Sequence, residues 1–496
     1  MIRLNRAITI LLLTNATCLL AFWLVPRSDI ALRTVLIVVP GIFGIFEYLR
    51  ARYSSGWTIT CDVMTSAGVV IALLLPSLPL TLTPLTPGLE VSIGPYLEYF
   101  PDVAYAAVAG QSLFFISYAA SVGDAVLIRR IRPFSLTAIS IDPKYFFKIF
   151  FVLIALAWSA RVVLLLTGSY YHQFRSEFQE DNVPAYSALA QLAWFGLFVV
   201  MGAWIQVFAA PLGTTRKTKW LRWACLLTGA EVIWYAPAGG REPILLLFIA
   251  IFGAYVFVRR SVPTKAVLLS LPIALGVVLF MGVYREVIRV TAWSPRAIEL
   301  SEVTASVTEA KDQAGEAIVS GVWSEIISRP SEARPIAALM TGVPNDVPFQ
   351  SGETYVTALW AFVPRFIYPD KPQIITPINQ WFFQDEGGSS PLTLIGEGYF
   401  NFGWLGICLA LILGGLLAGM YDRLMWTKMA ASRSAVVWAT IYGGTAVTVL
   451  RLYSQTLGIW LGIFVKAVLL ALVLAWLARF FVGRENAEKR RPYLPR

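Results

Sequence analysis

Seven residues combine a proton-transferring or cationic side chain with a position beside an apolar segment. They are one carboxylate, the only histidine and five cations: Glu397, His172, Arg241, Arg365, Lys371, Arg285 and Arg451. Guanidinium forks match the geometry of phosphate oxygens, and a carboxylate or imidazole can accept a proton from an attacking hydroxyl. The set predicts a site whose cations bind a lipid-linked pyrophosphate and whose base activates an acceptor.

Two segments hold cations in defined backbone settings. Arg241 lies in GGRE at the start of an apolar stretch, where the N–H groups of a helix N-terminus reinforce anion binding. In VPRFIYPDKP, three prolines stiffen the turn that carries Arg365 and Lys371. All three cations are predicted pyrophosphate contacts. Two alternatives stay open: Arg241 anchors a helix end to lipid headgroups, and Lys371 pairs with Asp370 on an ordinary turn.

The two predicted bases differ in their surroundings. Glu397 lies in LIGEGYFNFGWLG between two glycines, which let a ligand or another backbone approach. Its alternative role is to complement the positive end of a helix dipole. His172 lies in SYYHQFRSEFQED, where an imidazole can act as acid or base near neutral pH. Its alternative role is to belong, with its tyrosine neighbours, to an interfacial aromatic belt. Arg285 and Arg451 are further, less strongly indicated candidates for phosphate binding.

Motifs of other chemistries are missing from the sequence. It has no GxxxxGK phosphate loop, no HExxH and no DxD. Its four cysteines lie in apolar stretches without paired spacing. We therefore expect no metal and no cofactor, and expect arginine and lysine to neutralise a departing pyrophosphate.

The composition places these residues in a membrane protein. Hydrophobic residues make up 57% of the 496 residues and charged residues 14%, whereas soluble domains are about 25% charged. Mean hydropathy is +0.66. The net charge is +10, which in a soluble protein could indicate nucleic-acid binding, but in a membrane protein the placement of the positive charges matters more than their sum. We expect an all-α polytopic protein in the lipid bilayer, with no nucleic-acid partner.

Runs of about 20 apolar residues, the length that crosses a bilayer, predict about twelve transmembrane helices. They are 7–25, 30–49, 63–82, 102–122, 146–167, 185–209, 221–237, 243–258, 266–284, 394–418, 434–450 and 457–478. The first resembles a signal sequence but lacks a small-x-small cleavage site, so we interpret it as a retained helix. The predicted organisation is helices one to nine in 1–284, a periplasmic loop domain in 285–393, helices ten to twelve in 394–478 and a basic cytoplasmic tail in 479–496.

Lys and Arg cluster in alternate loops, as the positive-inside rule expects of cytoplasmic loops. Examples are Arg50 with Arg52, Arg129 with Arg130, and the C-terminal tail. The intervening loops are nearly free of cations, so both termini are predicted to be cytoplasmic.

The loop 285–393 falls on the outer side and has over 100 residues, whereas structureless loops rarely exceed about 15 residues. Residues 297–326 have the apolar spacing of an amphipathic helix. The segment ETYVTALWAFV is too short to span and precedes the proline-rich turn, which indicates an interfacial or re-entrant helix.

Small residues and buried charges also predict helix packing. Gly415 with Gly419, and Gly458 with Gly462, have the GxxxG spacing of closely packed helices. Charges within predicted spans are expected to pair, and the sequence leaves the partners open among Arg161, Glu231 and Lys466.

Many spans, one large outer loop late in the chain, the turn PRFIYPDKP and the following GEGYFNFGWLG together resemble the bacterial O-antigen polymerases. These are the Wzy-type oligosaccharide repeat-unit polymerases. The resemblance is strongest from Glu353 to Gly419 and rests upstream on topology and the GGRE segment. It implies a C-type glycosyltransferase-like fold in the bacterial inner membrane. It also implies metal-independent transfer of a growing glycan from undecaprenyl pyrophosphate to the next lipid-linked repeat unit of O-antigen, capsule or exopolysaccharide.

The resemblance assigns roles to several residues. Arg365 and Lys371 correspond to the family's proline-bounded basic turn, and Glu397 to its Glu-containing entry into the late span. Arg241 resembles the arginine of the family's outer-loop segments, although the R-x10-G spacing is not met because glycine follows at Gly253. A flippase and a chain-length regulator are the implied protein partners.

Two other functions remain as alternatives. An O-antigen ligase, or another lipid-linked glycan transferase, would use the same donor and a different acceptor. A twelve-span secondary transporter fits the predicted span count, but the two halves of the sequence show none of the internal symmetry that such transporters often have.

Overall fold

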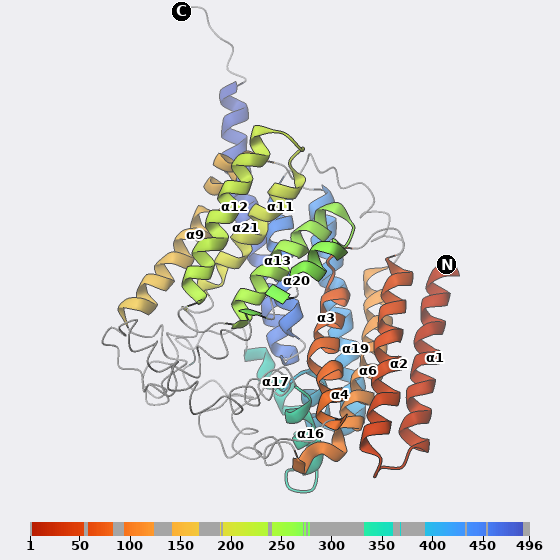
Figure 1. Ribbon diagram of the computed structural model, residues 1–496. Helices are drawn as coiled ribbons and strands as arrows, with labels where there is room; N and C mark the ends of the chain where they lie inside the picture. Colours follow the sequence, from red (N-terminus) through yellow and green to blue (C-terminus); the bar gives the residue numbers. More distant parts are fainter. Residues whose placement is uncertain are drawn as a thin grey trace, which may run out of the picture.

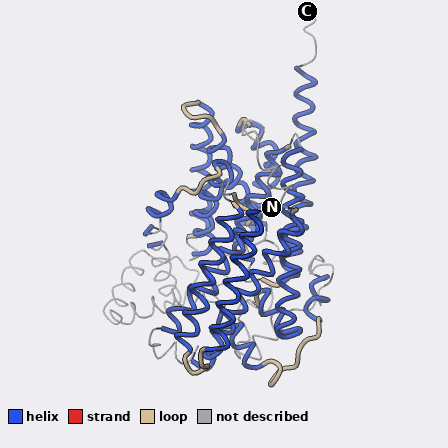
Figure 2. The backbone as a smooth tube through the Cα atoms, turned by 90° about the vertical axis from the view of Figure 1, so that its right-hand side faces the viewer, coloured by secondary structure: helices blue, strands red, loops and turns tan. Residues whose placement is uncertain are grey.

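The computed structural model describes residues 2–53, 58–82, 94–123, 141–167, 189, 192–236, 241–270, 272–273, 276–277, 332–360, 368, 392–431, 434–452 and 455–489. Within these ranges the regular elements are all helical, with no strand (Figure 2). The elements are α1 (Ile2–Leu24), α2 (Ile30–Arg52), α3 (Cys61–Val69), η1 (Val70–Leu74), α4 (Leu75–Leu82), η2 (Gly94–Tyr99), α6 (Phe100–Val122), α9 (Pro143–Leu166), α11 (Phe195–Ala209), α12 (Thr215–Tyr235), α13 (Arg241–Arg259), α16 (Ala333–Gly342), α17 (Glu353–Leu359), α19 (Leu394–Ala431), α20 (Ala435–Leu452) and α21 (Leu457–Lys489).

Seven described segments are long and apolar enough to cross a membrane. They are Ala7–Leu24, Ile30–Arg52, Cys61–Leu82, Gly94–Val122, Pro143–Leu166, Leu394–Ala430 and Leu457–Arg479. Two shorter apolar helices accompany them, Phe195–Ala209 and Pro243–Arg259. The chain is therefore a multi-pass, all-α membrane protein, as its composition predicts. The count of twelve spans stays a prediction, and most of the predicted ninth span, 266–284, lies outside the described residues.

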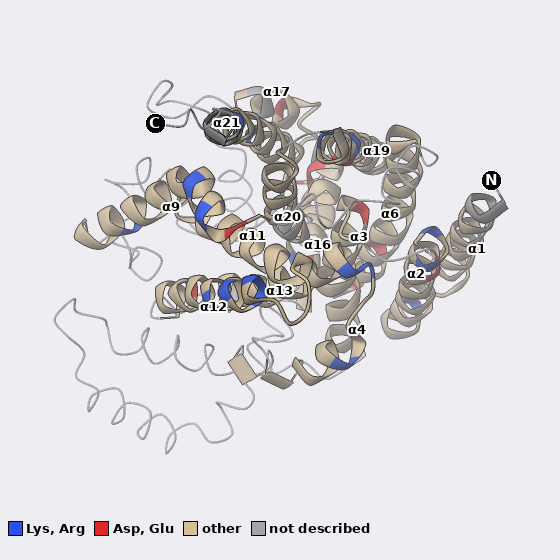
Figure 3. Cartoon of the chain, turned by 90° about the horizontal axis from the view of Figure 1, so that it is seen from above, with Lys and Arg blue, Asp and Glu red and all other residues tan. Residues whose placement is uncertain are grey.

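The start of α1 and the end of α21 both lie at one end of the bundle, the upper end in Figure 1. The short helices α16 and α17 lie at the opposite, lower end. Viewed from above, α1 and α2 form one edge and α9 and α12 the other (Figure 3). Between these edges, α6 packs extensively against α19, and α11 against α13 and α20.

Close packing of α6 against α19 depends on the first predicted glycine pair. A Cβ atom at Gly415 would meet the carbonyl oxygen of Phe114, and one at Gly419 would meet the Ser121 hydroxyl. These contacts confirm the predicted role of the pair. The second predicted pair differs, because no described atom lies within 4 Å of a Cβ built at Gly462.

Replacing Gly415 by valine is therefore expected to lower the apparent melting midpoint of the solubilised protein. Overpacking a close contact costs about 1 to 3 kcal/mol, and the backbone of α6 cannot move aside as a side chain can. The midpoint is measured by size-exclusion chromatography after heating. Gly462→Val is the matched control and should melt as the wild type does. Equal losses in the two variants would argue against the close α6–α19 contact.

The helix α19 is broken near its start, where the sequence analysis expects one continuous span. Phe402 has φ −142° and Gly403 has φ +61° with ψ −144°, a backbone conformation that glycine adopts without strain. The break separates a half-helix, residues 394–401, from the long remainder of α19. The two parts cross so closely that a Cβ at Gly398 would meet the carbonyl group of Gly406. The glycines flanking Glu397 were expected to permit such an approach, and Gly398 does.

Candidate functional site

Glu397 is the one predicted site residue whose side chain the structure describes. Arg241 is the first residue of α13 and Arg451 lies in the last turn of α20, which places both backbones toward the lower end of the bundle. The remaining predicted site residues, His172, Arg285, Arg365 and Lys371, lie outside the described residues. The same holds for the predicted amphipathic helix 297–326 and for most of the basic turn. The predicted short helix from Glu353 onward is present as α17.

The carboxylate of Glu397 joins three helices at the lower end. Its side chain is fully buried. The Thr354 hydroxyl on α17 donates to Oε1 at 3.2 Å, and the backbone N–H of Leu457, the first residue of α21, donates to Oε2 at 2.6 Å. Glu397 therefore complements the positive end of α21, and it also lies in the first turn of its own helix α19, as its alternative role predicts.

Asn401, one turn after Glu397 on the half-helix, holds the start of α17 against the broken helix. Its amide nitrogen donates to the Thr354 hydroxyl at 2.6 Å and to the carbonyl oxygen of Glu397 at 2.7 Å. Its amide oxygen accepts from the backbone N–H of Gly352 at 2.9 Å. Gly352 has φ +97°, which favours glycine at that position. The start of α17 is thus held by side chains of the half-helix.

Tyr355 adds a hydroxyl that is not engaged by any other described residue. Its oxygen is buried and has no hydrogen-bond partner among the described atoms. Burial raises the pKa of the Tyr355 phenol, and the negative charge of Glu397 raises it further. A buried donor without a partner is costly and can serve a bound ligand. We call Thr354, Tyr355, Glu397 and Asn401 the lower polar centre.

The chemistry open to the lower polar centre follows from these contacts. It offers one carboxylate, one free phenolic donor and two hydrogen-bonding side chains that hold them in place. Both carboxylate oxygens of Glu397 already accept a hydrogen bond. Each oxygen keeps a second lone pair, which can accept from an incoming hydroxyl.

A buried ion pair joins α9 and α12. Nη2 of Arg161 is 2.6 Å from Oε2 of Glu231 and donates to the carbonyl oxygen of Ala193 at 3.0 Å. The guanidinium also lies over the rings of Trp158 and Trp234, at 4.9 and 5.3 Å from their centroids. The sequence predicts pairing among the charges within spans, and the structure selects Glu231 as the partner of Arg161.

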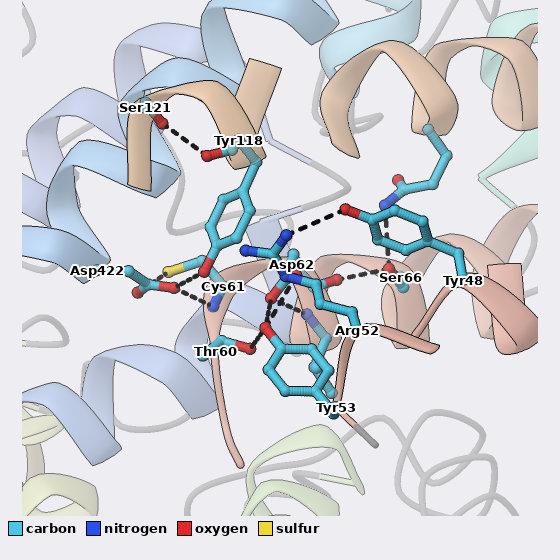
Figure 4. Close-up of polar contacts among 12 residues, drawn as sticks. Tyr48, Arg52, Tyr53, Thr60, Cys61, Asp62, Ser66, Tyr118, Ser121 and Asp422 are labelled. Carbon is cyan, nitrogen blue, oxygen red and sulfur yellow. Dashed lines mark hydrogen bonds and ion pairs between the residues drawn. The ribbon is translucent and has the colours of Figure 1, made fainter. Parts of the chain in front are cut away.

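A third polar cluster ties five elements together at the upper end (Figure 4). Asp422 on α19 accepts from the backbone N–H of Cys61 at 2.9 Å and from the hydroxyl of Tyr118 on α6. The hydroxyl of Tyr442 on α20 lies 3.0 Å from its other oxygen. Asp62 on α3 forms an ion pair of 3.2 Å with Arg52 at the end of α2.

The cluster around Asp62 and Asp422 has the features of a structural element that holds the helices together. Both oxygens of Asp422 accept hydrogen bonds, and Asp62 accepts one from the Tyr53 hydroxyl at 2.8 Å as well as pairing with Arg52. Buried carboxylates need such partners, because a buried charge left without one is strongly destabilising. Asp62 and Asp422 are not among the predicted site residues, because they lie just outside the predicted spans 63–82 and 394–418. The structure extends both membrane segments to include them.

Comparison with known proteins places part of the chain in a family. The family described as "Domain of unknown function (DUF8712)" matches residues 143–424, more than half of the chain. The match contains the Arg161–Glu231 pair, the lower polar centre and Asp422. No curated protein and no solved structure matches the chain.

Proposed function

The chain belongs to the DUF8712 family, and we propose that it polymerises lipid-linked oligosaccharide repeat units. In this proposal a growing glycan passes from undecaprenyl pyrophosphate to the next lipid-linked unit. The bond between the anomeric carbon and the pyrophosphate oxygen breaks, and a glycosidic bond forms to a hydroxyl of the acceptor. The hydroxyl proton goes to a base, and undecaprenyl pyrophosphate leaves. The reaction requires no metal and no nucleotide sugar.

The observation that carries this proposal is the lower polar centre, where an outer-loop helix packs onto a broken membrane helix around Glu397. A lipid-linked donor keeps its chain in the bilayer and its glycan in water, so its reacting bond lies at the membrane boundary. Residues from α17 and α19 meet near the lower ends of the long helices. A buried carboxylate beside an unengaged phenol supplies polar groups at that place.

The proposal orients the lower end toward the periplasm of a bacterial inner membrane. The upper end carries the exposed Arg50 near the end of α2 and the exposed Lys219 in the first turns of α12. Lys and Arg near helix ends favour the cytoplasmic side. Both termini, which lie at the upper end, are then cytoplasmic.

The proposed roles divide between cations and a base. Arg241, Arg365 and Lys371 hold the pyrophosphate, and Arg285 and Arg451 assist them. One preorganised donor at such a site lowers the barrier by about 3 kcal/mol. Glu397 accepts the proton of the acceptor hydroxyl, which donates to a free lone pair of the carboxylate, or His172 does so instead. A general base typically contributes about 10²- to 10⁴-fold in rate.

Reconstitution with synthetic lipid-linked repeat units tests the reaction itself. The wild-type protein in liposomes is expected to convert these units into a ladder of products that differ by one unit. A single transfer to lipid A core without a ladder would indicate a ligase instead. Solute uptake by the same liposomes, without any glycan product, would indicate a transporter.

Removing a predicted pyrophosphate contact should abolish the ladder and leave the protein in the membrane. Arg365→Ala and Arg241→Ala are each expected to slow elongation by roughly 100-fold or more, because the leaving group loses a charged donor. Cells carrying these variants should make polysaccharide with one repeat unit. Lys219→Ala, at the exposed upper end of α12, is the control and should leave chain length unchanged. Long chains from both arginine variants would reject the assigned site.

A further inference from the structure

A cavity of about 210 Å³ opens beside η2, α6 and the break of α19. Its wall includes Arg27, Glu98, Tyr99, Asp102, Tyr399 and Trp404. Because one water occupies about 30 Å³ of liquid, the cavity has room for a single small ring. Pockets for drug-sized ligands begin at about 300 Å³. The lower polar centre includes none of these residues.

Two aromatic side chains form a fixed corner of the cavity. The rings of Tyr399 and Trp404 stand perpendicular, with centroids 6.4 Å apart. The Tyr399 hydroxyl donates to the carbonyl oxygen of Val343 at 3.3 Å. The ring of Tyr105 packs against Trp404, with ring centroids 6.1 Å apart. Trp404 remains 43% exposed. The corner exists because the break at Phe402 and Gly403 turns the chain between the two rings, and a corner already in place costs little ordering on binding.

Two carboxylates in the same wall accept no hydrogen bond from the side chain of another described residue, although Asp102 accepts one from its own backbone N–H. Neither Glu98 nor Asp102 accepts a side-chain hydrogen bond or forms an ion pair within the part of the chain that the structure describes. The nearby guanidinium of Arg33 attracts Asp102 electrostatically and instead donates to the carbonyl oxygen of Phe22 at 2.8 Å. Ionised carboxylates only accept hydrogen bonds. A ligand that satisfies them must therefore bring its own donors.

The wall chemistry excludes several ligand classes. A phosphate would be repelled by Glu98 and Asp102, and an acyl chain has no donors for them. A small cation would meet the positive charges of Arg27 and Arg33. A neutral sugar ring fits all parts of the wall, because its hydroxyls donate to carboxylates and its apolar C–H face packs on an aromatic ring.

We propose that this cavity binds one neutral sugar ring, packed against Trp404 and hydrogen-bonded to Glu98 and Asp102. Glu397 and Tyr399 are two positions apart on the half-helix and so point to opposite sides of it. The bound ring therefore lies across the half-helix from the lower polar centre, at a distance from the reacting bond. That this ring belongs to the glycan being elongated rests on the proposed function. Remote binding of this kind helps to position a polymer for reaction.

Binding of free oligosaccharides tests the cavity without any transfer reaction. The purified full chain in detergent is applied to an array of short bacterial oligosaccharides, and the strongest binder is examined by saturation-transfer difference NMR. Trp404→Ala is expected to weaken binding about tenfold, and Trp404→Phe, which keeps an aromatic face, should weaken it less. Glu98→Gln with Asp102→Asn keeps the wall's shape and should weaken binding by a similar factor.

Matched controls lie on the same end of the molecule. Trp23→Ala removes a tryptophan that is 76% exposed at the end of α1, and Asp346→Asn removes an exposed carboxylate after α16. Both should bind as the wild type does. Wild-type protein that binds no sugar on the array, or binding that survives Trp404→Ala, overturns the proposal. Trp404-dependent binding without any elongation ladder would support the sugar cavity and reject the proposed polymerase alone.

Discussion

Arg161→Met is expected to lower the apparent melting midpoint by on the order of 10 °C. Removing one partner of a buried ion pair leaves the other charge without compensation, which costs about 3 to 5 kcal/mol. Glu231 is almost fully buried, and within the described part of the chain Arg161 is its only ion-pair partner. The midpoint is measured by tryptophan fluorescence during heating of the detergent-solubilised protein.

The double variant Arg161→Met with Glu231→Leu separates loss of the pair from loss of volume. Replacing both charges by apolar groups of similar size is often neutral or stabilising, so the double variant should melt well above the single one. Gly196→Ala gives an independent check, because its Cβ would collide with Oε1 of Glu231 and displace the pair. A double variant no more stable than Arg161→Met would show that the pair itself is not the source of the loss.

Glu397→Gln is expected to retain the fold and to lose chain elongation by about 10²- to 10⁴-fold. Glutamine has the shape of glutamate. Its amide oxygen can accept from the Leu457 N–H, while its amide nitrogen donates to the Thr354 hydroxyl. The variant loses the basic carboxylate that would take the proton from the hydroxyl of the acceptor glycan. The readouts are the ladder from synthetic lipid-linked units and the melting midpoint of the same preparation.

Glu397→Ala distinguishes support of the fold from proton transfer. It leaves two donors without an acceptor, and hydrogen bonds to a charged group are worth about 1.5 to 3 kcal/mol each. We therefore expect this variant to melt earlier and to be inactive. Glu353→Gln, an exposed carboxylate at the start of α17, is the control and should match the wild type. A full ladder from Glu397→Gln would assign Glu397 to holding α17 and α21 in place, and would move the base role to His172 or to no residue.

Several membrane helices could be predicted closely from sequence because each depends on a local property, whereas α19 continues to Ala431, beyond the predicted end at residue 418. An apolar run long enough to cross a bilayer forms a helix in order to satisfy its own backbone groups. The predicted spans 30–49 and 146–167 differ from α2 and α9 by no more than three residues at either end. The first predicted GxxxG pair was also confirmed, because glycine spacing marks the face of a helix whatever its partner.

The break in α19 was predictable in part. The stretch FNFGWLG is apolar enough to be taken for a continuous span, and the glycines beside Glu397 did indicate a close backbone approach. The place of the turn depends on Gly403 adopting positive φ while Gly398 and Gly406 pack together. No local pattern states that these two glycines are in contact.

The sequence by itself determined that this chain is a multi-pass helical membrane protein, and which residues are charged within apolar stretches. Only the tertiary structure decided their partners: Arg161 with Glu231, Asp422 with Cys61 and Tyr118, and Glu397 with the first N–H of α21. It also brought Glu98, Asp102 and Trp404 to one cavity. The physical reason is the distance along the chain over which the interactions act. Helix formation needs only neighbours along the chain. A buried charge instead needs a partner on another helix, and which helix packs there depends on residues far away in the sequence.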